Sequence, residues 1–231
     1  MTRNAIFFII LAAFTAIPSF AQKPSAESIR KRLSLGFGIN NDIWMKIPDS
    51  ISPRKINQGA DVFMNYMFPM DKKGHLSFFI GAGFGMHNLY HDALIGIDDN
   101  GVSYFYNAPA KVNNYNITVK KSKLSLTYFD IPFGFQYKAT NKLHGTLGFK
   151  VGWSWNEHSK YKGSDLAGTG YTVKEKELNL RNVETFHYGP YAVIGYKWFG
   201  LSVFYQLTSV FVKDYGPQIY PVTVGLVFKP F

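Results

Sequence analysis

A nearly unbroken alternation of apolar with small or polar residues, from Leu143 to Trp155, constrains the fold of this chain more than any other feature. The apolar positions are Leu143, Leu147, Phe149, Val151, Trp153 and Trp155. A period of two predicts a β-strand, because successive side chains point to opposite faces of a sheet. At about 13 residues, the segment is far longer than the usual strand of about 5–6 residues. A long strand whose apolar face ends in aromatic residues is what a transmembrane β-barrel requires.

About eight segments along the chain share this alternating pattern, and we expect each to be a strand. They lie near residues 32–40, 59–70, 75–87, 128–138, 143–155, 187–198, 201–208 and 219–231. Tight turns are expected at residues 71–74, 139–142 and 199–200, and long polar loops at residues 41–58, 88–127, 156–186 and 209–218. Short turns on the periplasmic side and long loops outside are typical of outer-membrane proteins.

Residues 22–231 are therefore predicted to be all-β. We expect an eight-stranded antiparallel transmembrane up-and-down β-barrel with short periplasmic turns and long extracellular loops. An even number of strands places both ends of the barrel in the periplasm. The alternative is a soluble β-sandwich, which would have shorter strands, polar outer faces and no alternation of loop lengths.

Residues 1–21 have the layout of a secretory signal peptide. Arg3 supplies a positive charge, residues 6–17 are apolar, and the sequence Ser-Phe-Ala before residue 22 suits cleavage. The apolar stretch is shorter than the about 20 residues that a membrane-spanning helix needs. We therefore expect a mature chain that begins near Gln22 and is exported to the outer membrane. A retained N-terminal anchor is the alternative, and the lack of Cys excludes a lipid-anchored lipoprotein.

The composition limits the partners that we expect. Lys and Arg together number 25 against 15 Asp and Glu, which gives a formal net charge of +10, and the chain has no Cys for disulfides. Such a charge can indicate a nucleic-acid-binding protein. For an exported barrel we expect no nucleic acid as a partner, and lipopolysaccharide phosphates or an acidic protein fit better. The simplest alternative is that the lysines are solvated on loops.

Aromatic residues fall at two levels of the predicted barrel. With the N-terminus in the periplasm, the strand at 143–155 runs outward, whereas the strands at 128–138 and 187–198 run inward. The outer level then holds Trp153, Trp155 and Tyr188, and the inner level holds Tyr137, Tyr196 and Trp198. Two aromatic girdles are expected where a barrel meets the two interfaces of a bilayer.

The inward positions of an eight-stranded barrel should pack against one another, because the space inside is only wide enough for side chains. Many are glycine, namely Gly36, Gly38, Gly81, Gly83, Gly85, Gly134, Gly148 and Gly152, and the polar ones are Asp61, Asp130, Gln136, Lys150, Lys197 and Gln206. Asp130 and Lys150 lie at nearly equal distances from the 139–142 turn, which predicts a cross-strand ion pair. The pair belongs either to a satisfied, filled lumen, which we favour, or to a proton or ion path.

Three motifs that resemble functional sites have simpler explanations. The run from Gly81 to Gly85 lacks the spacing and the helix of a dinucleotide loop and fits a curved strand. His87 and His91 would share a metal only on a helix. Glu, His and Ser at residues 157–159 suggest a lipid A hydrolase or acyltransferase, but adjacent side chains diverge. We therefore expect no catalytic residue, no cofactor and no metal.

The long loop at 88–127 carries two groups of residues that point to recognition. Its aromatic residues are Tyr90, Tyr104, Phe105, Tyr106 and Tyr115. They either form a recognition surface or fold down and seal the barrel mouth. Its lysines Lys120, Lys121 and Lys123 are placed near the outer leaflet, where they can contact lipopolysaccharide phosphates.

The segment from Ser122 to Lys138, SKLSLTYFDIPFGFQYK, resembles a hallmark of the PorT-like outer-membrane β-barrel family of Bacteroidetes. In that family a Tyr-hydrophobic-acid-Ile-Pro block leads into an apolar strand that ends in Tyr-Lys. The matching residues here are Tyr128, Phe129, Asp130, Ile131, Pro132, Tyr137 and Lys138. The family often has Leu at the position of Phe129 and Glu at that of Asp130. Only this strand is distinctive, although the layout of the whole mature chain is similar.

The resemblance implies a role without catalysis. The named member of the family is associated with the type IX secretion system, and no catalytic residues come with the family. We therefore expect a non-enzymatic structural or accessory component of the outer membrane, linked in its narrower form to type IX protein secretion. A narrow-pore channel for ions or small solutes and a lipid A-modifying enzyme are the alternatives.

Overall fold

The computed structural model describes residues 29, 32–49 and 51–229, and the predicted signal peptide lies outside them. From Leu33 onward these residues form one compact unit that is built of β-strands. Eight strands make up its main sheet: β1 (Leu33–Met45), β2 (Gln58–Pro69), β3 (Leu76–His91), β8 (Val119–Lys138), β9 (Leu143–Ser164), β11 (Phe186–Tyr196), β12 (Phe199–Tyr205) and β13 (Tyr220–Phe228).

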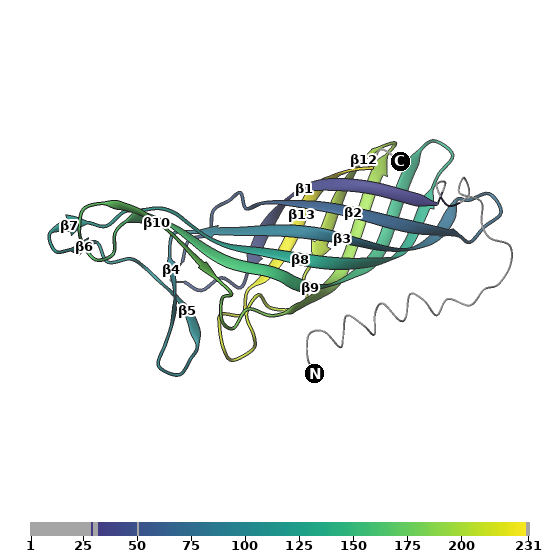
Figure 1. The fold of residues 1–231 in the computed structure, drawn as a ribbon. Coiled ribbons are helices and arrows are strands. Elements are labelled where there is room, and N and C mark those ends of the chain that lie inside the picture. The colour runs from purple at the N-terminus through teal and green to yellow at the C-terminus, as the bar shows by residue number, and fades with distance from the viewer. Residues whose placement is uncertain (1–28, 30–31, 50, 230–231) are drawn as a thin grey trace. The chain divides into compact units, whose positions relative to one another are not determined.

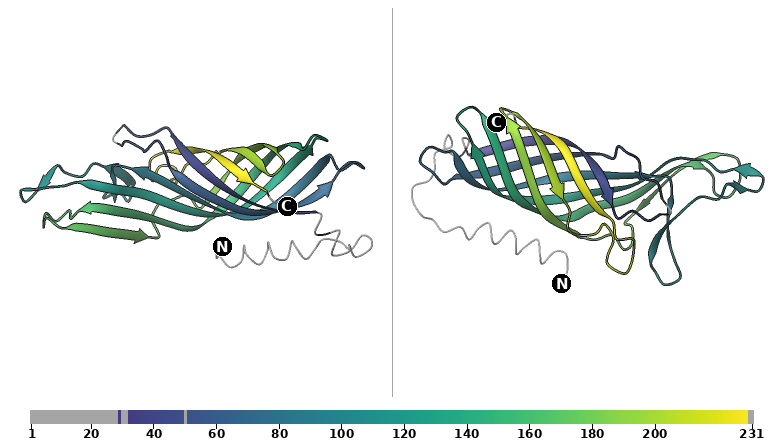
Figure 2. Two further views of the ribbon diagram at one scale, coloured as in Figure 1. Left: turned by 90° about the horizontal axis from the view of Figure 1, so that it is seen from above. Right: turned by 180° about the vertical axis from the view of Figure 1, so that it is seen from behind.

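These eight strands close into a ring. Along the sheet the order is β9-β11-β12-β13-β1-β2-β3-β8, and β8 pairs back onto β9. Every pairing in the ring is antiparallel and joins strands that follow one another around it. Figures 1 and 2 show the ring from three sides. The prediction of an eight-stranded antiparallel up-and-down barrel is confirmed.

Five shorter strands lie outside the ring, at the end where the long connections are. Two small hairpins lie between β3 and β8, and one further strand pairs with β9 beyond the ring (Figure 1). These strands are β4 (Leu94–Ile97), β5 (Ser103–Tyr106), β6 (Lys111–Val112), β7 (Tyr115–Asn116) and β10 (Thr172–Leu178). Within the described residues, no helix has the length and apolar character to cross a membrane.

Side-chain exposure alternates along the strands of the ring, as the period of two predicts. On the outer face, Leu147 is 71% exposed and Ile39 is 62% exposed. On the inner face, Asp42 and His187 are fully buried. Apolar side chains that face outward with polar ones inside are the reverse of a soluble core, and they suit a ring that is surrounded by lipid.

Glycine permits close contact between β8 and β9. Gly134 has a φ of 154°, and a Cβ placed there would lie 2.4 Å from the Cα of Gly148 on the neighbouring strand. Any larger residue would push the two backbones apart. Glycines that face inward therefore allow neighbouring strands of the ring to approach closely.

One predicted turn was placed wrongly. Tyr196 pairs with Phe199, so the tight turn consists of Lys197 and Trp198 rather than of residues 199–200. Lys197 has a φ of 54° and is exposed, and it does not face the lumen as we expected. The reason is the geometry of the hairpin, because a two-residue turn needs a positive φ at its first central residue.

The strands extend further into the predicted loops than expected. β8 begins at Val119 and β9 ends at Ser164, although the sequence predicts loops at 88–127 and 156–186. A register shift between Thr127 and Tyr128, where Trp155 has no partner on β8, interrupts the alternation; beyond it the period of two resumes, with lysine in place of apolar residues on the outer face. The prediction relied on apolar outer positions, which a strand needs only where it contacts lipid.

Candidate functional site

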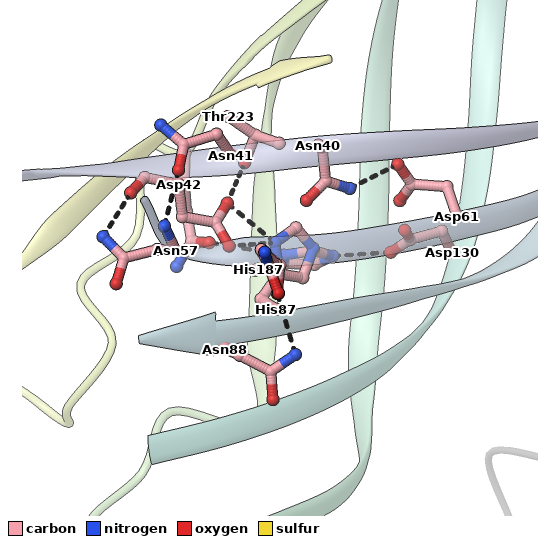
Figure 3. A network of polar contacts seen from close by, with 12 residues as sticks. Asn40, Asn41, Asp42, Asn57, Asp61, His87, Asn88, Asp130, His187 and Thr223 are labelled. Carbon is pink, nitrogen blue, oxygen red and sulfur yellow. Dashed lines mark hydrogen bonds and ion pairs between the residues drawn. The ribbon is translucent and has the colours of Figure 1, made fainter. Parts of the chain in front are cut away.

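A buried polar network crosses the lumen near the loop end of the ring (Figure 3). Its first cluster is centred on Asp42 of β1, which is fully buried. The Thr223 hydroxyl of β13 donates a hydrogen bond of 2.6 Å to Asp42 Oδ1. The same oxygen lies 2.9 Å from Nδ1 of His87 on β3. Three strands that are far apart in sequence thus meet on one carboxylate.

The second cluster is centred on Asp130 of β8. Its Oδ1 lies 2.5 Å from Nε2 of His187 on β11, and its Oδ2 lies 3.4 Å from Nζ of Lys150 on β9. The ion pair between Asp130 and Lys150 is diagonal, because Asp130 pairs with Gly152 in the backbone register. A Cβ at Gly152 would lie 2.1 Å from Asp130 Oδ1, so this glycine makes room for the carboxylate.

His187, like Asp42, Thr223 and Asn40, is a lumen residue that the sequence analysis did not single out. It is fully buried, and its ring stacks on that of Tyr128 with centroids 3.8 Å apart. Its inward position follows from the alternation of the strand near 187–198. The pairing with Asp130 does not follow from the sequence, because β11 contacts β9 and not β8.

The lumen polar groups make several cross-strand contacts, but some buried atoms, including Asp61 Oδ1, Asn65 Oδ1 and His87 Nε2, have no hydrogen-bond partner among the described residues. Asn40 Nδ2 donates a hydrogen bond of 2.6 Å to Asp61 Oδ2, which adds a third cross-strand contact to the two carboxylate clusters. The cavity that Asp61 and Lys150 help to line measures about 70 Å³. Typical ligand pockets measure roughly 300–1,000 Å³. This cavity can hold a few water molecules, but it has no room for a solute.

An apolar cluster, which we call the mouth cluster, lies at the loop end of the ring. It comprises Trp44, Ile51, Leu89, Ala93, Phe105, Leu124, Leu126, Tyr128, Leu180, Val210, Phe211 and Ile219, with Ile47, Ile95 and Val183 packed against it. With the residues packed against it, the cluster draws on five strands of the ring or the hairpins and on four connections between strands. The mouth cluster therefore ties the loops together above the polar lumen.

The predicted aromatic loop residues divide between burial and exposure. Phe105 is 6% exposed, and its ring contacts those of His91 and Phe211 at 5.0 and 5.9 Å. It therefore seals the mouth instead of forming a recognition surface. Tyr104 and Tyr106, on either side of it in β5, are exposed with ring centroids 5.6 Å apart.

Tyr115 and Tyr90 occupy different surroundings. Tyr115 is exposed in the small strand β7. Tyr90 lies in β3 rather than in a loop, and three cations surround its ring. The Nζ atoms of Lys121 and Lys123 lie 5.1 and 5.5 Å from the ring centroid, and Cζ of Arg54 lies 5.4 Å from it. Tyr90 therefore belongs to a basic surface.

The predicted girdle residues lie on the outer face. Near the short turns, Tyr137, Tyr196 and Trp198 are all more than half exposed. Towards the loop end, Trp155 and Tyr188 are exposed and Trp153 is half-buried against Phe129, with ring centroids 4.7 Å apart. Two girdles at the membrane interfaces remain a prediction.

The short-turn end of the ring opens on a basic cavity. This cavity measures about 620 Å³, and among the residues that the structure describes its lining contains no acidic side chain. The basic residues that line it are Lys138, Lys142, His144, Lys197 and Lys229. Lys229 also lines the small inner cavity, so it stands between the lumen and this opening.

The motifs that we discounted stay separate in space. His87 contacts Asp42, whereas His91 Nδ1 lies 2.9 Å from the carbonyl oxygen of Ala93. Glu, His and Ser at 157–159 lie in β9 rather than in a loop, so successive side chains point to opposite faces. Among the described residues, no group of three His, Cys, Asp or Glu side chains could hold a metal ion.

The sequence matches the protein family described as outer membrane protein beta-barrel domain over residues 20–212. The chain belongs to this family. It is therefore an integral β-barrel protein of the outer membrane, and the ring of eight strands is its membrane-spanning part. No curated protein matches the chain.

Among solved structures, the chain is similar to Ail, the attachment invasion locus protein of Yersinia pestis, which was solved alone and in complex with the heparin analogue sucrose octasulfate. The identity is 12%, the match covers 85% of this chain and 96% of that chain, and the TM-score is 0.39. A mutant of the porin of Rhodopseudomonas blastica matches with 10% identity, coverage of 85% and 99%, and a TM-score of 0.22. At these TM-scores, the fold is assigned from the strand pairings and the family match.

Proposed function

We propose that this protein is a closed, non-enzymatic barrel that serves the outer membrane as a structural or accessory component and works through its outer and extracellular surfaces. The observation that carries the proposal is one arrangement: the clusters around Asp42 and Asp130 occupy the lumen, and the mouth cluster lies above them. A protein that transports solutes through its barrel needs an open path, and open channels have about 16 strands. The proposal includes export by the predicted signal peptide, residues 1–21.

The narrower form of the proposal is a link to type IX protein secretion. It rests on the resemblance of the segment from Tyr128 to Pro132 to the PorT-like family. In the structure, Tyr128 and Asp130 of this segment are buried in the lumen network, and Pro132 lines the inner cavity. Those positions explain the segment by packing, so the link to secretion needs its own test.

The two alternative functions have weaker support. A narrow pore would have to pass the mouth cluster and a cavity of about 70 Å³. A lipid A-modifying enzyme would need His158 to reach Ser159. Instead, His158 Nδ1 lies 2.9 Å from Asn156 Oδ1, and Ser159 pairs with the buried Leu124 on the opposite face of β9.

Lipopolysaccharide is the partner that we propose for the outer surface. The lysines Lys120, Lys121 and Lys123 lie in the part of β8 beyond the predicted outer girdle. Cationic side chains just above a lipid-facing band can contact the phosphates of the outer leaflet. A secretion or assembly complex remains the second partner in the proposal.

The experiment that tests the accessory role is a gentle detergent extraction of the tagged protein from its native outer membrane, followed by mass spectrometry of the proteins that co-purify. A secretion or assembly component in near-stoichiometric amount is the expected result. A protein that is recovered alone would contradict the accessory role.

The same extraction can locate the contact. The variant Tyr104→Ala/Tyr106→Ala removes two exposed rings from the β4–β5 hairpin and should lower the recovery of the partner. Tyr171→Ala, at a site that is 75% exposed, is the matched control and should leave recovery unchanged.

A further inference from the structure

Beyond the lipid-facing part of the ring, three strands continue the main sheet into the extracellular region. β9 pairs with β11 only as far as Trp153, which lies opposite Phe186. After that point β9 runs between β8 and β10 and pairs with both, as Figure 1 shows. We call the part of β8 and β9 that follows, together with β10, the extracellular sheet.

Lysines occupy matching positions on all three strands of this sheet. Lys162 on β9 pairs with Lys121 on β8 and with Lys174 on β10. Two residues earlier on β9, Lys160 pairs in the same way with Lys123 and Lys176. Paired residues, and residues two apart on a strand, point to the same face of a sheet. The lysine grid is this set of two rows of three: Lys121, Lys123, Lys160, Lys162, Lys174 and Lys176.

The lysine grid continues the lipid-facing side of the barrel. Lys123 pairs with Tyr90 on β3, and Phe84 and Met86 share the face of Tyr90 further down that strand. Phe84 and Met86 are exposed on the outside of the ring. The opposite face of the extracellular sheet holds Leu124, which is fully buried. The grid therefore stands directly above the apolar band that contacts lipid.

The arrangement is unfavourable for the isolated protein. Like charges that lie opposite each other on neighbouring strands destabilise a sheet. The two acids of β10, Glu175 and Glu177, alternate with the lysines and point to the other face. Among the described residues, no acidic side chain lies within 4.0 Å of a grid lysine. All the grid lysines are exposed except Lys123, which is half-buried.

The pKa of Lys123, which lies in the part of β8 beyond the lipid-facing band, is lowered mainly by burial. Burial, together with the charges of Lys160 and Lys121, lowers the pKa of Lys123 to about 8. An anion that approaches this face would relieve the repulsion. Solvated lysines of a loop would have no reason to align in register across three strands.

We propose that the lysine grid binds the phosphate groups of a phosphorylated glycolipid of the outer leaflet. Strands in a sheet lie about 4.8 Å apart and alternate residues about 6.8 Å apart, so each phosphate can contact two or three ammonium groups at once. The position above the apolar band matches a headgroup whose acyl chains lie against the barrel. This inference rests on the lipopolysaccharide contact proposed above. It assigns that contact to the lysine grid instead of to Lys120, Lys121 and Lys123 alone.

Arg54 extends the surface on the β3 side. Its guanidinium lies over Tyr90 and donates a hydrogen bond of 3.3 Å from Nη2 to the carbonyl oxygen of Lys120. A guanidinium that is held in this way remains free at its other nitrogens to contact a phosphate in bidentate fashion. Lys120 itself lies at a register shift between β8 and β9, outside the two rows of the grid.

The experiment compares lipid binding by the purified full-length protein and two charge-matched variants in neutral detergent micelles. The probes are bisphosphorylated lipid A, the same lipid after dephosphorylation, and inorganic pyrophosphate. The grid variant is Lys160→Gln/Lys162→Gln. The control is Lys72→Gln/Lys73→Gln, which removes the same charge from the turn at the opposite end of the ring.

We expect the grid variant to bind bisphosphorylated lipid A roughly 10- to 30-fold more weakly than wild type, because each lysine near an anionic surface contributes about 1 kcal/mol. The control should bind as wild type does, and dephosphorylated lipid should bind weakly to all three proteins. Equal binding by the grid variant and the control would overturn the proposal. Pyrophosphate that binds as tightly as the lipid would overturn the lipid as the source of the phosphate.

Two further readouts keep the outcome interpretable. Heat-modifiable migration on gels shows whether each variant is folded, and the pair Lys174→Gln/Lys176→Gln on β10 replaces the β9 pair if the latter does not fold. Binding that is lost in Lys120→Gln but kept in both grid variants would contradict the grid and leave the lipopolysaccharide contact proposed above intact. Loss of lipid binding without loss of co-purifying proteins would leave the accessory role intact.

Discussion

The lumen of the ring and the extracellular sheet both carry charged side chains at alternate strand positions, but they arrange charge in opposite ways. In the lumen, Asp130 contacts Lys150 and His187 within 3.4 Å. In the lysine grid, each lysine faces another lysine on the neighbouring strand. A buried charge must find its partner within the chain, because water cannot solvate it. Within the chain, Tyr90 and Asn88 contact only Lys121 and Lys123 of the grid, so an anionic partner outside the chain would relieve the remaining repulsion. We therefore interpret the lumen as structural and propose the outer surface as the place of binding.

The strongest test of this contrast removes the centre of the lumen network. Asp130→Ala leaves Lys150 buried without its carboxylate, and we expect the free energy of unfolding to fall by about 3–5 kcal/mol. Urea titration in detergent micelles measures the change. The double variant Asp130→Leu/Lys150→Met removes both charges and should lose much less. If Asp130→Ala is as stable as wild type, the Asp130–Lys150 pair is solvated and the lumen is open to water.

The mouth cluster should be almost as sensitive. Phe211 is 1% exposed within it, and Phe211→Ala should lower the free energy of unfolding by about 3 kcal/mol through the lost packing and the cavity that remains. The same urea titration applies. Tyr104→Ala on the exposed hairpin is the control and should change stability by less than about 0.5 kcal/mol. Similar values for both would show that the cluster does not hold the loops.

A smaller effect is expected where glycine makes room for the Asp130 carboxylate. A methyl group at Gly152 would lie 2.1 Å from Asp130 Oδ1, so Gly152→Ala should cost about 1–3 kcal/mol. Gly145 in the same strand has no atom within 4 Å of such a methyl group, and Gly145→Ala is the matched control. If both variants unfold at the same urea concentration, the close approach in the lumen is wrong.

The smallest predicted effect has the opposite sign. Lys162→Thr removes the central lysine of one row, and in the absence of lipid it should raise the free energy of unfolding by about 0.2–1 kcal/mol. Lys72→Thr in the short turn should be neutral. A clear loss of stability in Lys162→Thr would show that the grid lysines stabilise the sheet by themselves, which would contradict the contrast between the two regions.

The sequence predicted the ring well because contact with lipid requires apolar side chains at alternate positions of each strand. Every second residue from Leu143 to Trp155 must be apolar or small enough to face lipid, and that pattern placed β9 correctly at its start. The same criterion missed β10, Thr172–Leu178, whose alternation is between lysine and glutamate. Outside the membrane, water solvates lysine and glutamate on either face of a strand. The alternation of lysine with glutamate in β10 therefore contains no apolar residues by which it could be recognised.

The candidate site was predicted only in part. Asp130 and Lys150 are joined by a short hairpin, so their proximity could be read from the turn between them. Asp42 and Thr223 are 181 residues apart, and their contact depends on the closure of the ring between its first and last strands. The lysine grid depends on the register of three strands, and only Lys121 and Lys123 were noticed in the sequence.

Planar-bilayer recording of the purified full-length protein tests the closed lumen most directly. An open porin that is inserted under the same conditions serves as the positive control. We predict that the wild-type barrel gives no discrete conductance steps, because the mouth cluster lies above a lumen that polar side chains occupy. Steady, discrete conductance from the wild-type protein would contradict the closed lumen and would favour a narrow pore instead.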